Sequence, residues 1–141
     1  MIPHFADRVI KINTSTGEMT GYNSWPSGFA KGTHAFSGGV FDGTNVWMIP
    51  YNADRVIKID TSTGAMTGYN SWPAGFSKAG EDFSGGVFDG TNIWMIPHWA
   101  SHVIKINTST GAMTGYKSWP DGFKKGTNAF SGGGFDGTNV W

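Results

Sequence analysis

A 47-residue unit occurs three times in this chain, and this repetition constrains its fold more than any other feature. Trp47, Trp94 and Trp141 occupy the same position in successive units, which span residues 1–47, 48–94 and 95–141. The first two units differ at 11 positions. A period of this size is typical of solenoids and β-propellers, in which each unit packs mainly against its neighbours. The sequence is therefore informative about architecture and assembly before it says anything about a ligand.

Composition argues against several classes of partner. The 10 basic and 10 acidic residues give no net charge, so nothing predicts binding to nucleic acid or to an anionic membrane surface. No apolar stretch approaches the roughly 20 residues needed to cross a bilayer, and Met1-Ile2-Pro3-His4 does not resemble the start of a signal peptide. The absence of cysteine excludes disulfides and thiolate metal sites. We therefore expect no nucleic-acid or membrane partner and no cofactor.

Four short strands are expected in each period of the repeat. Between residues 36 and 72 they are 36–41, 46–49, 56–59 and 66–72. Asp42-Gly43 predicts a tight hairpin because glycine accepts a positive φ at little cost. Val46–Ile49 is apolar on both faces, which is typical of a strand covered by neighbouring sheets. Pro73 is expected to end the fourth strand because it lacks the N–H that a ladder requires. Four antiparallel strands every 47 residues match the blade of an all-β propeller.

Two sequence runs carry a family resemblance. DGTNVW (42–47) and ADRVIKINTSTG (6–17) resemble the repeats of YVTN-type and streptogramin-lyase-like β-propellers, which carry a DG-x-x-W element and a V-x-x-I-D/N-x-x-TG element. The likeness covers every unit, so it implies a propeller fold for the whole chain. It implies no particular activity, because such repeats serve in binding proteins, scaffolds and enzymes. No catalytic residue of a lyase can be matched to a position in this sequence.

Three blades are too few to close a ring, since closed propellers typically have about four to eight. We expect two identical chains to form a six-bladed homodimer, with a nine-bladed homotrimer as the alternative. Trp141 lies in the middle of an expected second strand, and Met1 matches Met48. Phe130–Trp141 of one chain is therefore expected to complete the blade begun by Met1–Pro26 of another, by strand exchange at each seam. The predicted seam residues are Met1, Ile2, Pro3, Phe130, Phe135, Val140 and Trp141.

Differences between the units gather in two loops. One follows the second strand (4–8, 51–55 and 98–102), and the other precedes the first strand (32–35, 79–82 and 126–129). In an up-and-down blade both loops emerge on one face, here called the variable face, where recognition is often carried. Unconstrained substitution in surface loops would also concentrate differences between the units in these loops. The candidate ligand-binding residues on this face are His4, His34, Tyr51, Glu81, His98, Trp99, His102 and Asn128.

Ordinary structural roles compete with each candidate. The histidines are expected to be exposed loop residues, and the spacing of His98 and His102 on a turn predicts no metal site. Trp99 is the best single aromatic contact, because its counterparts are Phe5 and Asn52. The invariant aspartates Asp42, Asp89 and Asp136 are expected to form turns. The invariant tryptophans Trp25, Trp72 and Trp119 are expected to pack between blades, and they could instead form platforms for sugars.

The near-identity of the units indicates an engineered or recently duplicated repeat protein. We predict no catalytic residues, since the sequence contains no nucleophile elbow, phosphate loop or His-Glu-x-x-His motif. The leading hypothesis is a symmetric, self-assembling scaffold without catalytic activity. The alternative is a carbohydrate- or small-ligand-binding, lectin-like propeller. A lyase-like enzyme that uses histidine and a metal ranks third.

Overall fold

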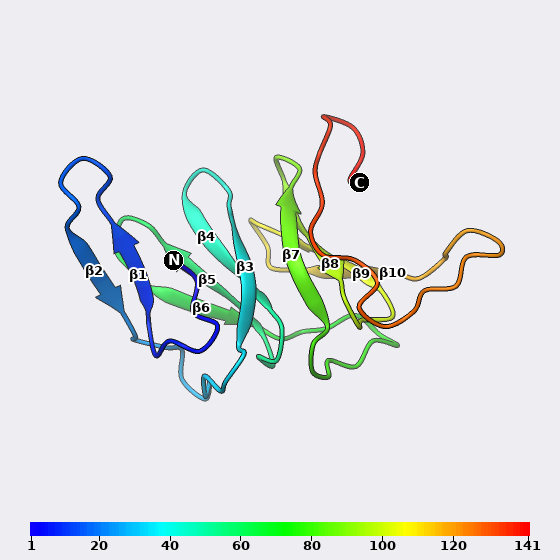
Figure 1. Cartoon of the computed structure of the whole chain (residues 1–141), viewed down its shortest axis with the longest axis horizontal. Helices are drawn as coiled ribbons and strands as arrows, with labels where there is room; N and C mark the ends of the chain where they lie inside the picture. Colours follow the sequence, from blue (N-terminus) through cyan, green and yellow to red (C-terminus); the bar gives the residue numbers. More distant parts are fainter.

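The computed structural model describes all 141 residues and contains strands but no helix. Ten strands form three antiparallel sheets that stand side by side in an arc (Figure 1). The strands are β1 (Val9–Ile12), β2 (Met19–Tyr22), β3 (Phe36–Phe41), β4 (Asn45–Pro50), β5 (Val56–Asp60), β6 (Met66–Tyr69), β7 (Phe83–Phe88), β8 (Asn92–Pro97), β9 (Val103–Asn107) and β10 (Met113–Tyr116). The chain forms no helix with the length and apolar character that crossing a bilayer requires.

Two sheets are complete four-stranded blades. Blade A contains β3-β4-β5-β6 in chain order, and blade B contains β7-β8-β9-β10. Each begins with the predicted Asp-Gly hairpin, whose first strand has the expected bounds, 36–41 in blade A. The expected fourth strand, 66–72, was wrong at its end, because β6 stops at Tyr69. Tyr69 pairs with Val56, the first residue of β5, so no strand remains to pair with the following residues.

Two incomplete blades flank this pair. The N-terminal half-blade comprises residues 1–25 and contains β1 and β2, in which Val9 pairs with Tyr22 as Val56 pairs with Tyr69 in blade A. The amide of Ile10 donates to the Met1 carbonyl at 3.2 Å, so Met1 lies beside β1 as Met48 lies beside β5. This half-blade therefore has the outer strands of a blade and the end of its second strand.

The C-terminal half-blade comprises residues 130–141. Its Phe135 bridges to Val140 as Phe41 pairs with Val46 in blade A, and Gly134 and Trp141 exchange backbone hydrogen bonds. It therefore has the inner hairpin of a blade without the two outer strands.

Glycine allows the inner strands of adjacent blades to approach closely. Gly38 has a φ of 83°, and a Cβ built on it would lie 3.5 Å from the Cα of Gly85 in the neighbouring blade. Gly85 meets Gly132 in the same way, at 3.4 Å. The small residues of the first strand thus bring backbone against backbone where the blades converge, as the sequence predicted.

Two apolar cores lie between the blades. One joins the N-terminal half-blade to blade A, and the other joins blade A to blade B. In the second core, blade A contributes Trp47, Ile49, Val56, Tyr69 and Trp72. Blade B contributes Ile93, Met95, Ile104, Ile106 and Met113. The buried apolar side chains of this fold therefore pack between blades, which explains why β4 and β8 are apolar on both faces.

The invariant aspartates of the hairpins hold the repeated tryptophans by hydrogen bonds. Asp42 accepts the Trp47 indole N–H at 2.6 Å, and Asp89 accepts that of Trp94 at 2.5 Å. Burial opposes ionisation of Asp89, but the Trp94 indole and the amides of the hairpin outweigh it and lower the pKa of Asp89 to about 2. These carboxylates are thus turn-forming and packing groups, as the Asp-Gly hairpin predicts.

Candidate functional site

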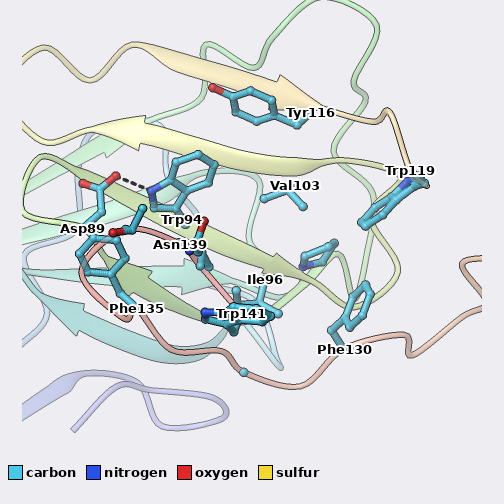
Figure 2. A pocket seen from close by; sticks show the side chains of 14 residues that line it. Asp89, Trp94, Ile96, Val103, Tyr116, Trp119, Phe130, Phe135, Asn139 and Trp141 are labelled. Atoms are coloured by element: carbon cyan, nitrogen blue, oxygen red, sulfur yellow. Dashed lines mark hydrogen bonds between the residues drawn. The ribbon is translucent and has the colours of Figure 1, made fainter.

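An apolar groove lies on the open side of blade B, beside the C-terminal half-blade (Figure 2). Its volume is about 550 Å³. Five apolar side chains of blade B and of the loop that follows it line the groove: Trp94, Ile96, Val103, Tyr116 and Trp119. The C-terminal half-blade adds Phe130, Phe135, Val140 and Trp141.

The groove corresponds, by the 47-residue repeat, to the face that blade A packs against blade B. Its five residues from blade B and the following loop are the counterparts, 47 positions on, of those that blade A packs against blade B. Trp47 is fully buried, whereas Trp94 is half-buried in the same position of blade B. The groove is therefore half of an inter-blade core, with one blade present and most of the other missing.

The N-terminal half-blade exposes residues equivalent to those that form the other side of the core between blades A and B. Its outward-facing residues are the counterparts of Met95, Ile106 and Met113, all of which pack in the core between the complete blades. Their side chains are prominently exposed: 66% for Met1, 43% for Ile12 and 63% for Met19.

A lysine that lies over a tryptophan and a tyrosine in blade A lacks the tryptophan in the N-terminal half-blade. In blade A the Lys58 ammonium lies 5.5 Å from the ring centre of Trp47 and 5.8 Å from that of Tyr69. In the N-terminal half-blade Lys11 lies over Tyr22 at 5.6 Å with no tryptophan beside it. Trp141, the matching tryptophan, is 78% exposed.

A second, smaller groove of about 130 Å³ lies where that tryptophan is missing. It is lined by Ile2, Val9, Lys11, Tyr22, Val46 and Ile59, among others. Through the repeat, the exposed residues of the two ends thus correspond to residues that pack together between blades A and B. Among the predicted seam residues, Met1 and Ile2 line the groove of one end, Phe130, Phe135, Val140 and Trp141 line that of the other, and Pro3 is buried.

Most of this surface was not predicted from the sequence. The residues it did not single out are Ile12, Met19, Lys11 and Tyr22 at one end, and Trp94, Ile96, Val103, Tyr116 and Trp119 at the other. Their signal was present, since each repeats a residue of another unit, but only the structure shows which repeated residues pack between blades.

The variable face brings most of the candidate ligand-binding residues together. His4, Tyr51 and His98 form a row, with ring centres 5.8 Å apart between the first two and 5.6 Å apart between the last two. The loops that carry them contact each other, as in the backbone hydrogen bond from Trp99 to Glu81 at 3.1 Å. Burial and the neighbouring Glu81 carboxylate raise the pKa of Tyr51.

Substitutions on this face occur as contacting pairs 29 residues apart. His34 lies 4.0 Å from Phe5 between ring centres, and the Glu81 amide donates to the Asn52 side chain at 2.9 Å. In the third unit the Trp99 indole donates to the Asn128 side chain. The left-handed residues of this face are His34, Glu81 and Asn128, with φ values of 51°, 59° and 52°. These equivalent positions therefore meet in all three units, and each unit fills them with different side chains.

His102 does not belong to this row. The expectation that all four histidines are exposed was wrong for His102, which is 6% exposed. Its ring packs edge-on to Phe76 at 5.6 Å, and the Ser101 hydroxyl lies 2.7 Å from its Nδ1. Burial, with Lys117 nearby, lowers the pKa of His102. This histidine replaces Arg55 of the preceding unit, which lies over Phe29 in the same way, so the position serves blade packing.

Asp82 introduces a buried charge beneath the variable face. It replaces Ala35 of the first unit and forms an ion pair with Lys78 at 2.9 Å, in which both side chains are buried. The Lys78 ammonium also donates to the carbonyls of Tyr51 and Ala79, and the Ala79 amide donates to Asp82. Because every polar group of this pair is satisfied, it acts as a structural bridge between loops.

Comparisons with known proteins identify the fold. No protein-family model matches the sequence, and no curated protein sequence matches it. Two solved structures are similar: a virginiamycin B lyase from Staphylococcus aureus and a streptogramin B lyase, with TM-scores of 0.62 and 0.65. Each is 16% identical and covers 96% of this chain, which spans 41% of the length of either lyase. The chain therefore has a streptogramin-lyase-like β-propeller fold, with blades of four antiparallel strands.

Proposed function

We propose that this chain is a symmetric self-assembling β-propeller scaffold without catalytic activity, closing as a six-bladed ring of two copies. The observation that carries the proposal is the complementarity of the two open ends. One end presents Trp94, Ile96 and Val103 around a groove, and the other presents the counterparts of the residues that fill such a groove between blades A and B.

Exposed apolar surface of this kind favours association. Burying apolar side chains contributes roughly 25 cal/mol per Å², and the open ends expose several large ones. Joining the ends would also place Trp141 of one copy against Lys11 and Tyr22 of another, repeating the sandwich that Lys58 forms in blade A. Three copies in a nine-bladed ring would make the same contacts, so the seam chemistry is common to both.

Disulfide trapping tests the register of the proposed seam. Val46 pairs directly with Ile59 in blade A, so their counterparts, Val140 of one copy and Ile12 of another, should be direct partners. The chain has no cysteine, so in a Val140→Cys/Ile12→Cys variant the two introduced residues are the only thiols. Mild oxidation should give a covalent product of two chains.

Matched controls make this result specific. The Val140→Cys/Ser24→Cys variant places the second thiol on an exposed residue beyond β2 and should remain uncross-linked under the same conditions. Equal cross-linking of both variants, or none in either, would contradict the proposed seam. A three-chain product would support nine blades.

A second candidate function is carbohydrate binding on the variable face. Trp99 favours it, because the residue is 51% exposed while its indole N–H donates to the Asn128 side chain. Exposed, oriented aromatic rings of this kind stack on sugars. Binding on a glycan array that Trp99→Ala removes would support this function, and an array without signal would contradict it.

A further inference from the structure

The third unit keeps a lysine that pairs with an aspartate in the second unit, but it lacks the aspartate. Lys125 is the counterpart of Lys78, whereas the counterpart of Asp82 is Ala129. The ion pairs of the chain include Lys78 with Asp82 and none with Lys125. The second unit therefore supplies a carboxylate to this lysine, and the third unit does not.

The loop around Lys125 nevertheless makes the same hydrogen bonds as its counterpart in the second unit. The Lys125 ammonium donates to the carbonyls of His98 and Gly126, at 3.1 and 3.3 Å. Lys78 donates to the two equivalent carbonyls. The Ala129 amide donates to the His98 carbonyl at 3.0 Å, and the corresponding amide of the second unit makes the same bond at 3.3 Å. The ammonium is thus held in the same place without the carboxylate.

In the second unit, two donors meet at one oxygen of Asp82. The Lys78 Nζ lies 2.9 Å from Oδ2, and the Ala79 amide donates to the same oxygen at 2.6 Å. These short distances suit a carboxylate oxygen. The corresponding donors of the third unit are the Lys125 ammonium and the Gly126 amide, and this amide has no acceptor within the protein.

Solvent reaches this position in the third unit. Asp82 is only 4% exposed, whereas Ala129 is partly exposed and residues 126–128 of the loop are exposed. Alanine retains only the Cβ of an aspartate side chain, so the volume of one carboxylate group is free beside the two donors. A small anion can therefore enter where the second unit carries its own.

The charge of Lys125 also lacks a close partner from the preceding loop. Burial lowers the pKa of each repeated lysine, and in the first two units an aspartate of that loop, Asp7 or Asp54, opposes this effect on the pKa. In the third unit the counterpart of that aspartate is Ser101. The opposing charge on Lys125 comes from Asp82, which lies beyond ion-pair distance. A bound anion would stabilise this ammonium directly.

We propose that the third unit binds one small monocarboxylate, of the formate or acetate class, between the Lys125 ammonium and the Gly126 amide. The ligand takes the place that the Asp82 side chain fills in the second unit. Every group of the site belongs to one chain, so the site does not depend on the assembly proposed above.

The repeat supplies matched variants. Ala129→Asp gives the third unit the carboxylate of the second and should block the site. Asp82→Ala vacates the second unit and should create another site at Lys78. Lys125→Met removes the ammonium and keeps an unbranched side chain. Lys124→Met removes the same charge from the neighbouring, exposed lysine and serves as the control.

Titration with sodium formate, followed in proton–nitrogen correlation spectra of the labelled chain, tests the site. We expect a saturable shift of the Gly126 amide. Loss of a hydrogen bond to a charged group predicts binding at least about 10-fold weaker in Lys125→Met. Ala129→Asp should abolish the shift, and Lys124→Met should leave it unchanged. Asp82→Ala should add a saturable shift at the Ala79 amide.

Three results would overturn the inference. A Gly126 amide that does not respond to formate, or that responds equally in Lys125→Met, excludes the site. An equal response in Ala129→Asp shows that the anion does not occupy the position of the missing carboxylate. An equal shift with sodium chloride at the same concentration excludes a carboxylate site in favour of a general effect of salt.

Discussion

The interface between blades A and B and the open face of blade B are built from the same repeated residues, and they differ in whether a neighbouring blade covers them. Trp47 is fully buried in the first, and its counterpart Trp94 borders a groove in the second. Blade B has all four strands, as blade A does, so the two faces differ in their coverage and not in strand pairing. Covering the open face is the driving force available for association.

Substitution in the covered interface should have the largest effect. Trp47→Ala removes a fully buried ring and its hydrogen bond to Asp42, so the free energy of unfolding should fall by about 3–5 kcal/mol. Urea denaturation followed by circular dichroism measures this. A loss below about 1 kcal/mol would show that the two interfaces do not differ as described.

The same substitution at the open end should affect assembly and spare the protomer. Trp141→Ala removes an exposed ring, so we expect little change in protomer unfolding but a dissociation constant raised by roughly 30-fold, equivalent to about 2 kcal/mol. Analytical ultracentrifugation over a dilution series measures it. An unchanged dissociation constant would remove Trp141 from the seam.

A residue that breaks the repeat should sharpen the comparison. Val40 packs against Gly86 of the next blade, whereas the third unit has Gly134 in this position with open space around it. Gly134→Val should fill the corresponding gap at the seam and lower the dissociation constant about 5-fold, or about 1 kcal/mol. Val40→Gly is the reverse control and should destabilise the covered interface; stronger dissociation of Gly134→Val would contradict the equivalence.

His102 should give the smallest effect, visible as a pH dependence. Its pKa is lowered in the fold, so its contribution to stability is fully present above about pH 6.5 and decreases as the pH falls through the lowered pKa. His102→Arg should flatten the stability profile between about pH 6.5 and 5 by less than about 1 kcal/mol. Thermal unfolding across this range measures it, and identical slopes in both proteins would exclude a role for His102.

Much of the fold could be predicted because the repeat and the turns are local signals. The Asp42-Gly43 hairpin and the apolar strand around Trp47 indicated a blade without any knowledge of distant contacts. The end of β6 could not be predicted, because it depends on where β5 begins to offer a pairing partner. Strand length in a sheet is set by the neighbour as well as by the sequence of the strand.

The candidate sites depend still more on distant contacts. The loops of the variable face were identified from their differences, but the pairing of His34 with Phe5 arises where two loops meet. Burial of His102 follows from its contact with Phe76, which lies 26 positions earlier in the chain. Such contacts are set by how blades dock, and repetition alone does not reveal them.

Native mass spectrometry of the 141-residue chain tests the central claim most directly. The claim that a second copy covers the open face of blade B predicts a dominant species of twice the chain mass of 15.2 kDa, reverting to single chains in Trp141→Ala. Three times the chain mass would replace six blades with nine. A single-chain mass across the accessible concentration range would contradict the account.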